Sequence, residues 1–166
     1  MAKVKIENFV ASFTISSLLD LPKLAEILPD TTYKPDEVPV IILHFSKPRS
    51  IATLFSTGNV VVTGPRSMDE VHDVMKMVTD RLDVVGVQCD ETPEIKIKNV
   101  TISTDLQLSL NLRRLAKSLQ TVEYSPKVFP GLIYKGDDPN TVILLFYSGK
   151  IVCNGIRLRR CYCCSK

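Results

Sequence analysis

Apolar and polar residues in the first third of the chain alternate with two different periods. Residues 4–15 alternate loosely, as in a strand, and Leu21, Leu24 and Leu28 then recur at a helical spacing that Asp20 can cap. After a Tyr-x-Pro turn come three β-rich runs, VPVIILHF (38–45), SIATLFS (50–56) and NVVVTG (59–64), the last two joined by a tight Thr-Gly-Asn hairpin. The pattern predicts one strand, one short helix and three further strands.

A second, longer helix is predicted directly after these strands. Ser67 and Glu70 form a capping box, in which each end of the Ser-x-x-Glu unit satisfies a free backbone donor. One face of the helix is apolar, since aliphatic residues recur at the helical period. These residues are Val71, Val74, Met75, Val78, Leu82 and Val85.

The whole pattern is then written a second time, at a constant offset of 91 residues. Asn8 corresponds to Asn99 (99 − 8 = 91), Tyr33 to Tyr124 and Gly64 to Gly155, without a gap between residues 5 and 66. We therefore predict a first repeat at 1–87, a linker at 88–94 and a second repeat at 95–166. Only 11 residues follow Gly155, whereas the first copy continues through its long helix, so the second repeat is expected to lack that helix.

The strands are apolar on both faces, as in VIILHF and VILLFYS, while the helices can cover one face only. The fold class predicted is α+β, with two pseudo-symmetric repeats on one antiparallel sheet. The open face is expected to need a partner.

Composition narrows the class of protein without naming a partner. The chain has 166 residues, 45% of them apolar, and a formal net charge of +3. No apolar run approaches the roughly 20 residues that span a bilayer, and the odd number of cysteines argues against a disulfide framework, so an intracellular protein is expected. Cys161, Cys163 and Cys164 fit no zinc-site spacing, and His44 and His72 lie in no catalytic motif. We expect no enzyme activity, no cofactor and no bound metal.

The motifs of both repeats resemble those of the TATA-box-binding protein family of transcription initiation factors. They are IENFVAS and IKNVTIS, YKPDEVPVIILHF and YSPKVFPGLIYK, and KPRSIATLFSTGNVVVTGPR and DPNTVILLFYSGKIVCNGIR. The short start and SMDEVHDVMKMV look more archaeal than eukaryotic. The resemblance implies a saddle-shaped sheet whose concave face binds and bends TATA-like DNA from the minor groove, in the cytoplasm of an archaeon or the nucleus of a eukaryote.

The resemblance also assigns DNA-binding roles by position. Asn8 and Asn99 match amides that donate to base edges, and Phe129 with Phe146 matches a pair of rings that wedges into a base step; packing of Phe129 in the core is the alternative. Arg49, Arg66, Lys135, Lys150 and Arg157 match phosphate contacts. The remaining matched positions on the binding face are Val10, Val38, Pro39, Thr53, Phe55, Val61, Thr63, Thr101, Pro130, Leu144, Val152 and Asn154.

Some positions depart from the family pattern. Val38 stands where the first repeat should carry a ring, which predicts a weaker kink at that end of the DNA. The resemblance implies contact with transcription factor B and the polymerase machinery, and Ser125, Lys127 and Val128 occupy the factor B positions, where the family has acidic residues. An uncovered back face on the second repeat would also allow a homodimer.

Two other functions stay open at this point. One is a diverged interaction protein that keeps the fold but titrates transcription factors without bending promoters. The other is an accessory domain of a nuclease or glycosylase, although no catalytic domain is attached.

Overall fold

The structure is a computed structural model that describes residues 3–15, 18–90, 93–136 and 138–155. The chain divides into two compact units. The first unit comprises residues 8–98, and the second unit comprises residues 1–7 together with 99–166. The predicted repeat boundaries at 87 and 95 stay a prediction, because the units follow contacts rather than the sequence repeat.

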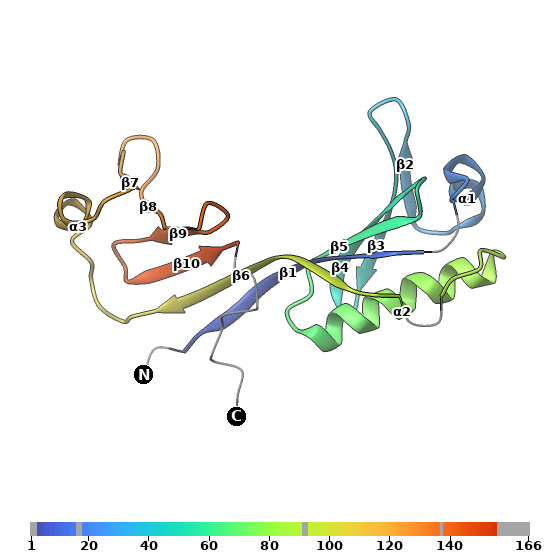
Figure 1. The fold of residues 1–166 in the computed structure, drawn as a ribbon, viewed down its shortest axis with the longest axis horizontal. Coiled ribbons are helices and arrows are strands. Elements are labelled where there is room, and N and C mark those ends of the chain that lie inside the picture. The colour runs from blue at the N-terminus through green and yellow to red at the C-terminus, as the bar shows by residue number, and fades with distance from the viewer. Residues whose placement is uncertain (1–2, 16–17, 91–92, 137, 156–166) are drawn as a thin grey trace. The chain divides into compact units, whose positions relative to one another are not determined.

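The described residues of the first unit form an antiparallel sheet with two helices (Figure 1). Its elements are β1 (Lys5–Thr14), α1 (Leu21–Ile27), β2 (Thr31–Lys34), β3 (Val38–Ser46), β4 (Arg49–Phe55), β5 (Asn59–Thr63) and α2 (Met68–Val84). The strands are neighbours in the order β2-β3-β4-β5-β1.

The second unit repeats the order of strands, and β7, β8 and β9 are shorter than β2, β3 and β4. Its elements are β6 (Lys96–Asp105), α3 (Leu112–Ser118), β7 (Val122–Glu123), β8 (Leu132–Lys135), β9 (Val142–Leu145) and β10 (Lys150–Asn154). The strands are neighbours in the order β6-β10-β9-β8-β7, and the described residues of the chain form ten strands in all. The start of β1 lies against β6, where Ser103 Oγ donates to Glu7 Oε1 at 2.7 Å. The predicted α+β class and two-repeat antiparallel sheet are confirmed.

Helix caps form where the sequence places them. Asp20 Oδ1 accepts from the amide of Lys23, and the corresponding Asn111 Oδ1 accepts from the amide of Arg114. Ser67 Oγ caps α2 by accepting from the amide of Glu70 at 3.1 Å. The Glu70 carboxylate reaches back one residue further than a capping box requires and accepts from the amide of Arg66.

The short strands β2 and β7 were not predicted. The sequence pattern indicated only a Tyr-x-Pro turn after the first helix, yet Thr31–Lys34 pairs with β3 and Val122–Glu123 pairs with β8. Both are edge strands, and segments this short carry too few residues for an alternation to be recognised. The described part of each repeat therefore has five strands where we predicted four.

The core of the first unit lies between the sheet and both helices. Alternate strand residues such as Ile41, Leu54 and Val62 are fully buried against Leu24 of α1 and Val78 of α2. The guanidinium of Arg81 closes one margin of this core, 4.8 Å from the centre of the Phe45 ring. No described helix has the length and apolar character to cross a membrane.

The same face of the second unit is less well covered. Ile102, Ile143, Leu145, Ile151 and Cys153 are only half-buried. Their counterparts in the first unit, at the offset of 91, have no exposed surface: Ala11, Ala52, Leu54, Val60 and Val62. The predicted absence of a second long helix concerns residues beyond Gly155, which lie outside the described part of the chain.

Candidate nucleic-acid interface

Each unit presents one strand face that its own helices do not cover. In the first unit, the period-2 alternation of strands places Val10, Thr53, Val61 and Thr63 on the face opposite the core, all half-buried. The pairing register brings them into rows, with Val10 opposite Thr63 and Thr53 opposite Val61. The result is a surface of small apolar and hydroxyl side chains.

The second unit builds the corresponding face from β6, β10, β9 and β8. Thr101 lies opposite Asn154, and Val152 lies opposite Leu144. Four of the predicted contact residues are thus brought together here, as they are in the first unit. A surface of this kind suits contact with another flat apolar surface, because it offers dispersion contacts and few hydrogen-bonding groups.

The two predicted asparagines lie beside the last strand of their units. The side-chain oxygen of Asn8 accepts from the Gly64 amide at 2.7 Å. The side-chain nitrogen of Asn8 donates to Thr63 Oγ1 over a longer distance of 3.3 Å. The Asn99 amide donates to Asn154 Oδ1 at 2.6 Å. Each amide has two hydrogens, so both side chains retain a donor for an acceptor outside the protein.

Phe129 and Phe146 form an aromatic pair at the end of the second unit's sheet. Their ring centres are 5.8 Å apart and their planes meet at 66°, an edge-to-face arrangement. Both rings are half-buried, so the alternative of a core position for Phe129 does not describe the structure. Gly131 makes room for them, since a Cβ there would lie 2.6 Å from Cε1 of Phe129.

The equivalent position in the first unit has a much smaller side chain. Val38 is 55% exposed, and Phe55, at the end of β4, is half-buried. Pro39 and Pro130, the prolines that follow Val38 and Phe129, are both exposed. The first unit therefore presents one ring where the second unit presents two.

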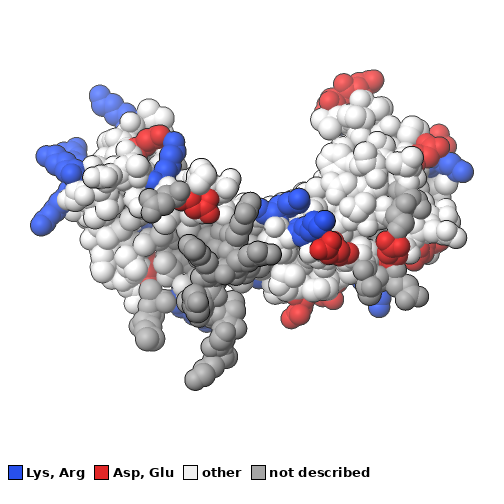
Figure 2. Space-filling view, in the orientation of Figure 1, with Lys and Arg blue, Asp and Glu red and all other residues white. Residues whose placement is uncertain are grey.

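The predicted phosphate contacts differ in their surroundings. Arg49, Arg66 and Lys150 are exposed, and none of them has an ion-pair partner among the described residues. Arg157 lies outside the described residues. Figure 2 shows the charged side chains, with Asp and Glu at the tip of the β2–β3 loop and Lys and Arg over α3.

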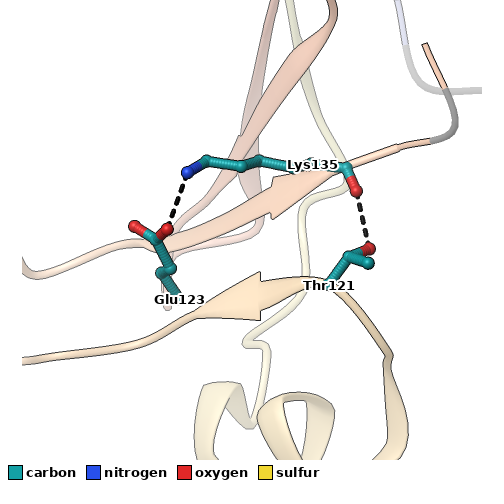
Figure 3. Close-up of polar contacts among 3 residues, drawn as sticks. All are labelled: Thr121, Glu123 and Lys135. Carbon is teal, nitrogen blue, oxygen red and sulfur yellow. Dashed lines mark hydrogen bonds and ion pairs between the residues drawn. The ribbon is translucent and has the colours of Figure 1, made fainter. Parts of the chain in front are cut away.

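Lys135 is the exception, because it is held by a neighbouring carboxylate. Its Nζ lies 2.6 Å from Glu123 Oε1, and Thr121 Oγ1 donates to the Lys135 carbonyl at 2.6 Å (Figure 3). Both side chains of the ion pair are more than half exposed, so the pair contributes about 1 kcal/mol or less and can open. A phosphate would have to compete with Glu123 for this lysine.

The positions predicted for factor B lie in the loop before β8. Ser125 anchors that loop, because its carbonyl accepts from the amides of both Val128 and Phe129 at 2.9 Å. Lys127 is exposed, and Val128 is 88% exposed. The loop is thus accessible to a partner.

Sequence reasoning missed three residues of the open faces. Ile42 lies opposite Thr53, Ile51 lies opposite Thr63, and Ile133 lies opposite Leu144. The alternation of strand residues could have identified them. Each of the three lies an even number of residues from a predicted contact on its own strand, or pairs directly with a predicted contact.

Among the described residues, no group of three His, Cys, Asp or Glu side chains could hold a metal ion; Cys161, Cys163 and Cys164 lie outside them.

Two copies of one α+β unit, each with an apolar strand face and an asparagine amide beside it, define a two-repeat protein whose strand faces are the candidate binding surface. Comparison with known proteins identifies the family. The family model described as "Transcription factor TFIID (or TATA-binding protein, TBP)" matches residues 3–84 and 94–160. The chain belongs to the TATA-binding protein family.

Similar proteins come from archaea. The chain is 43% identical over 155 residues to a TATA-box-binding protein of Thermococcus sibiricus, covering 93% of this chain and 84% of the relative. It is 43% identical to TATA-box-binding protein 2 of Haloferax volcanii, covering 92% of this chain and 83% of the relative. The solved structure of Methanococcus jannaschii TBP matches with a TM-score of 0.88 at 36% identity, covering 95% of this chain and 90% of that one.

Proposed function

We propose that this protein is a general transcription initiation factor that binds the minor groove of TATA-like promoter DNA. The observation that carries the proposal is the open strand face of each unit, with apolar side chains in register and one asparagine amide beside them. Relatives 43% identical are named TATA-box-binding proteins. The protein would act where the DNA is, in the cytoplasm of an archaeal cell.

The chemistry of the two surfaces is complementary. The minor groove is shallow and presents mainly acceptors, with the guanine amino group as its one donor. Valine and threonine side chains can lie flat against sugars and bases, and the Asn8 and Asn99 amides supply donors. A guanine amino group would oppose those donors and would sterically disturb the flat contact, so A·T pairs are favoured.

Bending is the second part of the proposal. Phe129 and Phe146, half-buried at the end of the sheet, would enter a base step and unstack it, which costs a few kcal/mol and allows the bent duplex to cover more protein surface. At the other end Val38 and Phe55 would act together, with less area to insert. The kink should therefore be weaker there.

The test measures affinity and bending on the same duplexes. Dyes at the two ends of a TATA duplex should show increased energy transfer on binding, and an A·T-rich duplex should bind at least about tenfold more tightly than a G·C-rich one at equal salt. Phe129→Ala with Phe146→Ala should reduce the energy transfer of the bound duplex. Equal affinity for the two duplexes would refute the specificity, and unchanged energy transfer at saturation would refute the wedge.

We further infer that the protein works by recruitment, without catalysis of its own. Ser125, Lys127 and Val128 lie in an accessible loop and would contact transcription factor B, which brings RNA polymerase. Purified factor B should further retard the protein–DNA complex in a gel shift, and Lys127→Glu should change that retardation. No further retardation by factor B would remove this partner.

A second copy of the chain is proposed as a partner of the half-buried back face of the second unit. Ile143, Leu145 and Ile151 present aliphatic surface there, and apolar surface of this kind favours association. Sedimentation equilibrium should give a dimer that Ile143→Lys dissociates. A monomer at all concentrations would refute it.

The competing function is an interaction protein that keeps the fold but does not bend promoters. Val38 in place of a ring and Lys127 in place of an acid favour it. The energy-transfer experiment separates the two functions, because only the initiation factor requires the ends of the duplex to approach.

A further inference from the structure

We propose that α3 and the loop 125–128 of the second unit form a binding surface for an acidic protein segment that carries one large apolar side chain. This surface adjoins the end of the second unit's strand face, because Pro130 belongs to both. The proposal rests on the proposed function only in that the loop is the region assigned to factor B. Whether the chain binds DNA does not enter the argument.

The first observation is the charge of this surface. Arg113, Arg114 and Lys117 of α3 and Lys127 of the loop are exposed, and no acidic residue lies within 111–118 or 125–128. Figure 2 shows Lys and Arg side chains gathered over α3. Among the described residues none of the four cations has a carboxylate partner. Lysine and arginine side chains without such a partner are available to one from outside.

The internal repeat supplies a comparison for this charge. The corresponding segments of the first unit, 20–27 and 34–37, hold two cations and four carboxylates, a net charge of −2 against +4 in the second unit. The six residues are Asp20, Lys23, Glu26, Lys34, Asp36 and Glu37. The backbone elements are the same, so the fold does not require either charge. Opposite charges on equivalent surfaces indicate partners of opposite charge.

The second observation is a pocket beside the same cations. It has a volume of about 550 Å³, and Leu110, Leu112, Arg113, Tyr124, Pro130 and Tyr147 are among its lining residues. Tyr147 is 68% exposed although its ring is largely apolar. A pocket of this size and lining accepts an aromatic or branched aliphatic side chain, with Arg113 at its margin for a flanking carboxylate.

The combination favours protein over nucleic acid. DNA phosphates would satisfy the cations but leave the apolar pocket empty. A peptide with carboxylates on both sides of a Phe or Leu can pair with the cations and also fill the pocket. In such interfaces the buried anchor supplies most of the affinity, and the surrounding charges supply the association rate and the choice of partner.

The test uses the full chain and a fluorescein-labelled 14-residue peptide with four Glu residues flanking one Phe. Fluorescence anisotropy at two salt concentrations should show binding that weakens as salt rises. A peptide with Ser in place of Phe should bind about tenfold more weakly or worse, and so should a peptide with Lys in place of the Glu residues. Arg113→Glu with Arg114→Glu in the protein should have the same effect, and Tyr147→Ser should lower the affinity without changing its salt dependence.

Matched controls separate this surface from the rest of the chain. Lys23→Glu, at the position equivalent to Arg114, should leave peptide binding unchanged, and all variants should keep the melting temperature of the parent chain. Equal binding of the Phe and Ser peptides, or binding unaffected by the arginine reversals, would overturn the proposal. So would displacement of the peptide by TATA duplex together with loss of duplex affinity in the arginine variants, since the surface would then bind phosphates. If the peptide binds and TATA duplex does not, only the function proposed above fails.

Discussion

Gly131 determines how closely two rings approach each other. A Cβ at this position would lie 2.6 Å from Cε1 of Phe129 and 3.1 Å from Cε1 of Phe146, closer than side chains tolerate. Both atoms belong to side chains that can turn, and the backbone carbonyl of Leu145, 3.3 Å from the added Cβ, would have to move by only a few tenths of an ångström. Gly131 is therefore needed for the arrangement of the two rings and is not needed for folding of the chain.

We expect Gly131→Ala to leave the chain folded and to displace the ring pair. Bending of a TATA duplex should then decrease, with affinity falling about tenfold, because a misplaced ring cannot enter the base step. Gly136→Ala is the matched control, since a Cβ there would meet only Cε1 of Tyr134 at an ordinary 3.5 Å. Energy transfer across the bound duplex is the measurement. Equal bending by the two variants would show that the spacing of the rings is unimportant.

At Val38 the opposite experiment is possible, in which an aromatic ring is added to the first unit. The side chain is 55% exposed, so a larger one meets no buried neighbour and should fold normally. Val38→Phe should increase bending at the end of the duplex that meets the first unit. A dye pair placed across that half of the duplex reports it, with a pair across the other half as the control. Unchanged transfer in both halves would mean that a ring at position 38 does not reach a base step.

At the scale of elements, α2 covers the back of the first unit. Its four buried residues, Val71, Val74, Val78 and Leu82, pack on a sheet face whose residues have almost no exposed surface. The strands of the second unit carry aliphatic residues at the same positions, but they remain half-buried. Burial of apolar side chains is the main stabilising contribution, so the second unit is expected to be the less stable.

The contribution of α2 can be measured with two valines on the same helix. Val78 is fully buried, and Val78→Ala removes two methyl groups and leaves a small cavity, which should lower the free energy of unfolding by about 2 kcal/mol. Val84 is 87% exposed, and Val84→Ala should change the free energy of unfolding by less than about 0.5 kcal/mol. Urea unfolding followed by circular dichroism gives both values. A similar loss for the two variants would contradict the packing described for α2.

Hydrogen exchange tests the predicted difference between the units directly. Amides of β9 and β10 should exchange faster than those of β4 and β5, because opening the second unit exposes less additional apolar surface. Addition of a partner that covers the back of the second unit should slow only the first group. Equal protection of the four strands in the isolated chain would refute the stability difference.

What the sequence could predict follows from the range of the interactions involved. The caps at Asp20, Ser67 and Asn111 depend on residues three positions apart, and the constant offset of 91 marks the repeat. The open faces follow from alternation along each strand. By contrast, the ion pair of Lys135 with Glu123 joins residues 12 apart on β8 and β7, and β7 itself was not foreseen. The family resemblance already paired Phe129 with Phe146, but the edge-to-face contact of their rings depends on how β8 and β9 pair.

For the molecule as a whole, the salt dependence of DNA binding should follow local cations and not the small net charge of +3. Five cations occupy predicted phosphate positions: Arg49, Arg66, Lys135, Lys150 and Arg157. If all five neutralise a phosphate, the logarithm of the binding constant should fall with the logarithm of salt concentration with a slope of about −4.5. A slope near zero would show that the cations do not meet the backbone of the duplex.

Glu123 should modify that slope, because it competes with a phosphate for Lys135. While the ion pair stays closed on DNA, only four cations contribute, and the slope should be about −3.6. Glu123→Gln removes the competing charge, so it should tighten binding at low salt and steepen the slope by about 0.9. Glu37→Gln makes the same change in an exposed pair with Lys34, which lies at no predicted phosphate position, and should leave the slope unaltered. Equal slopes for the parent chain and both variants would exclude competition between Glu123 and the DNA for Lys135.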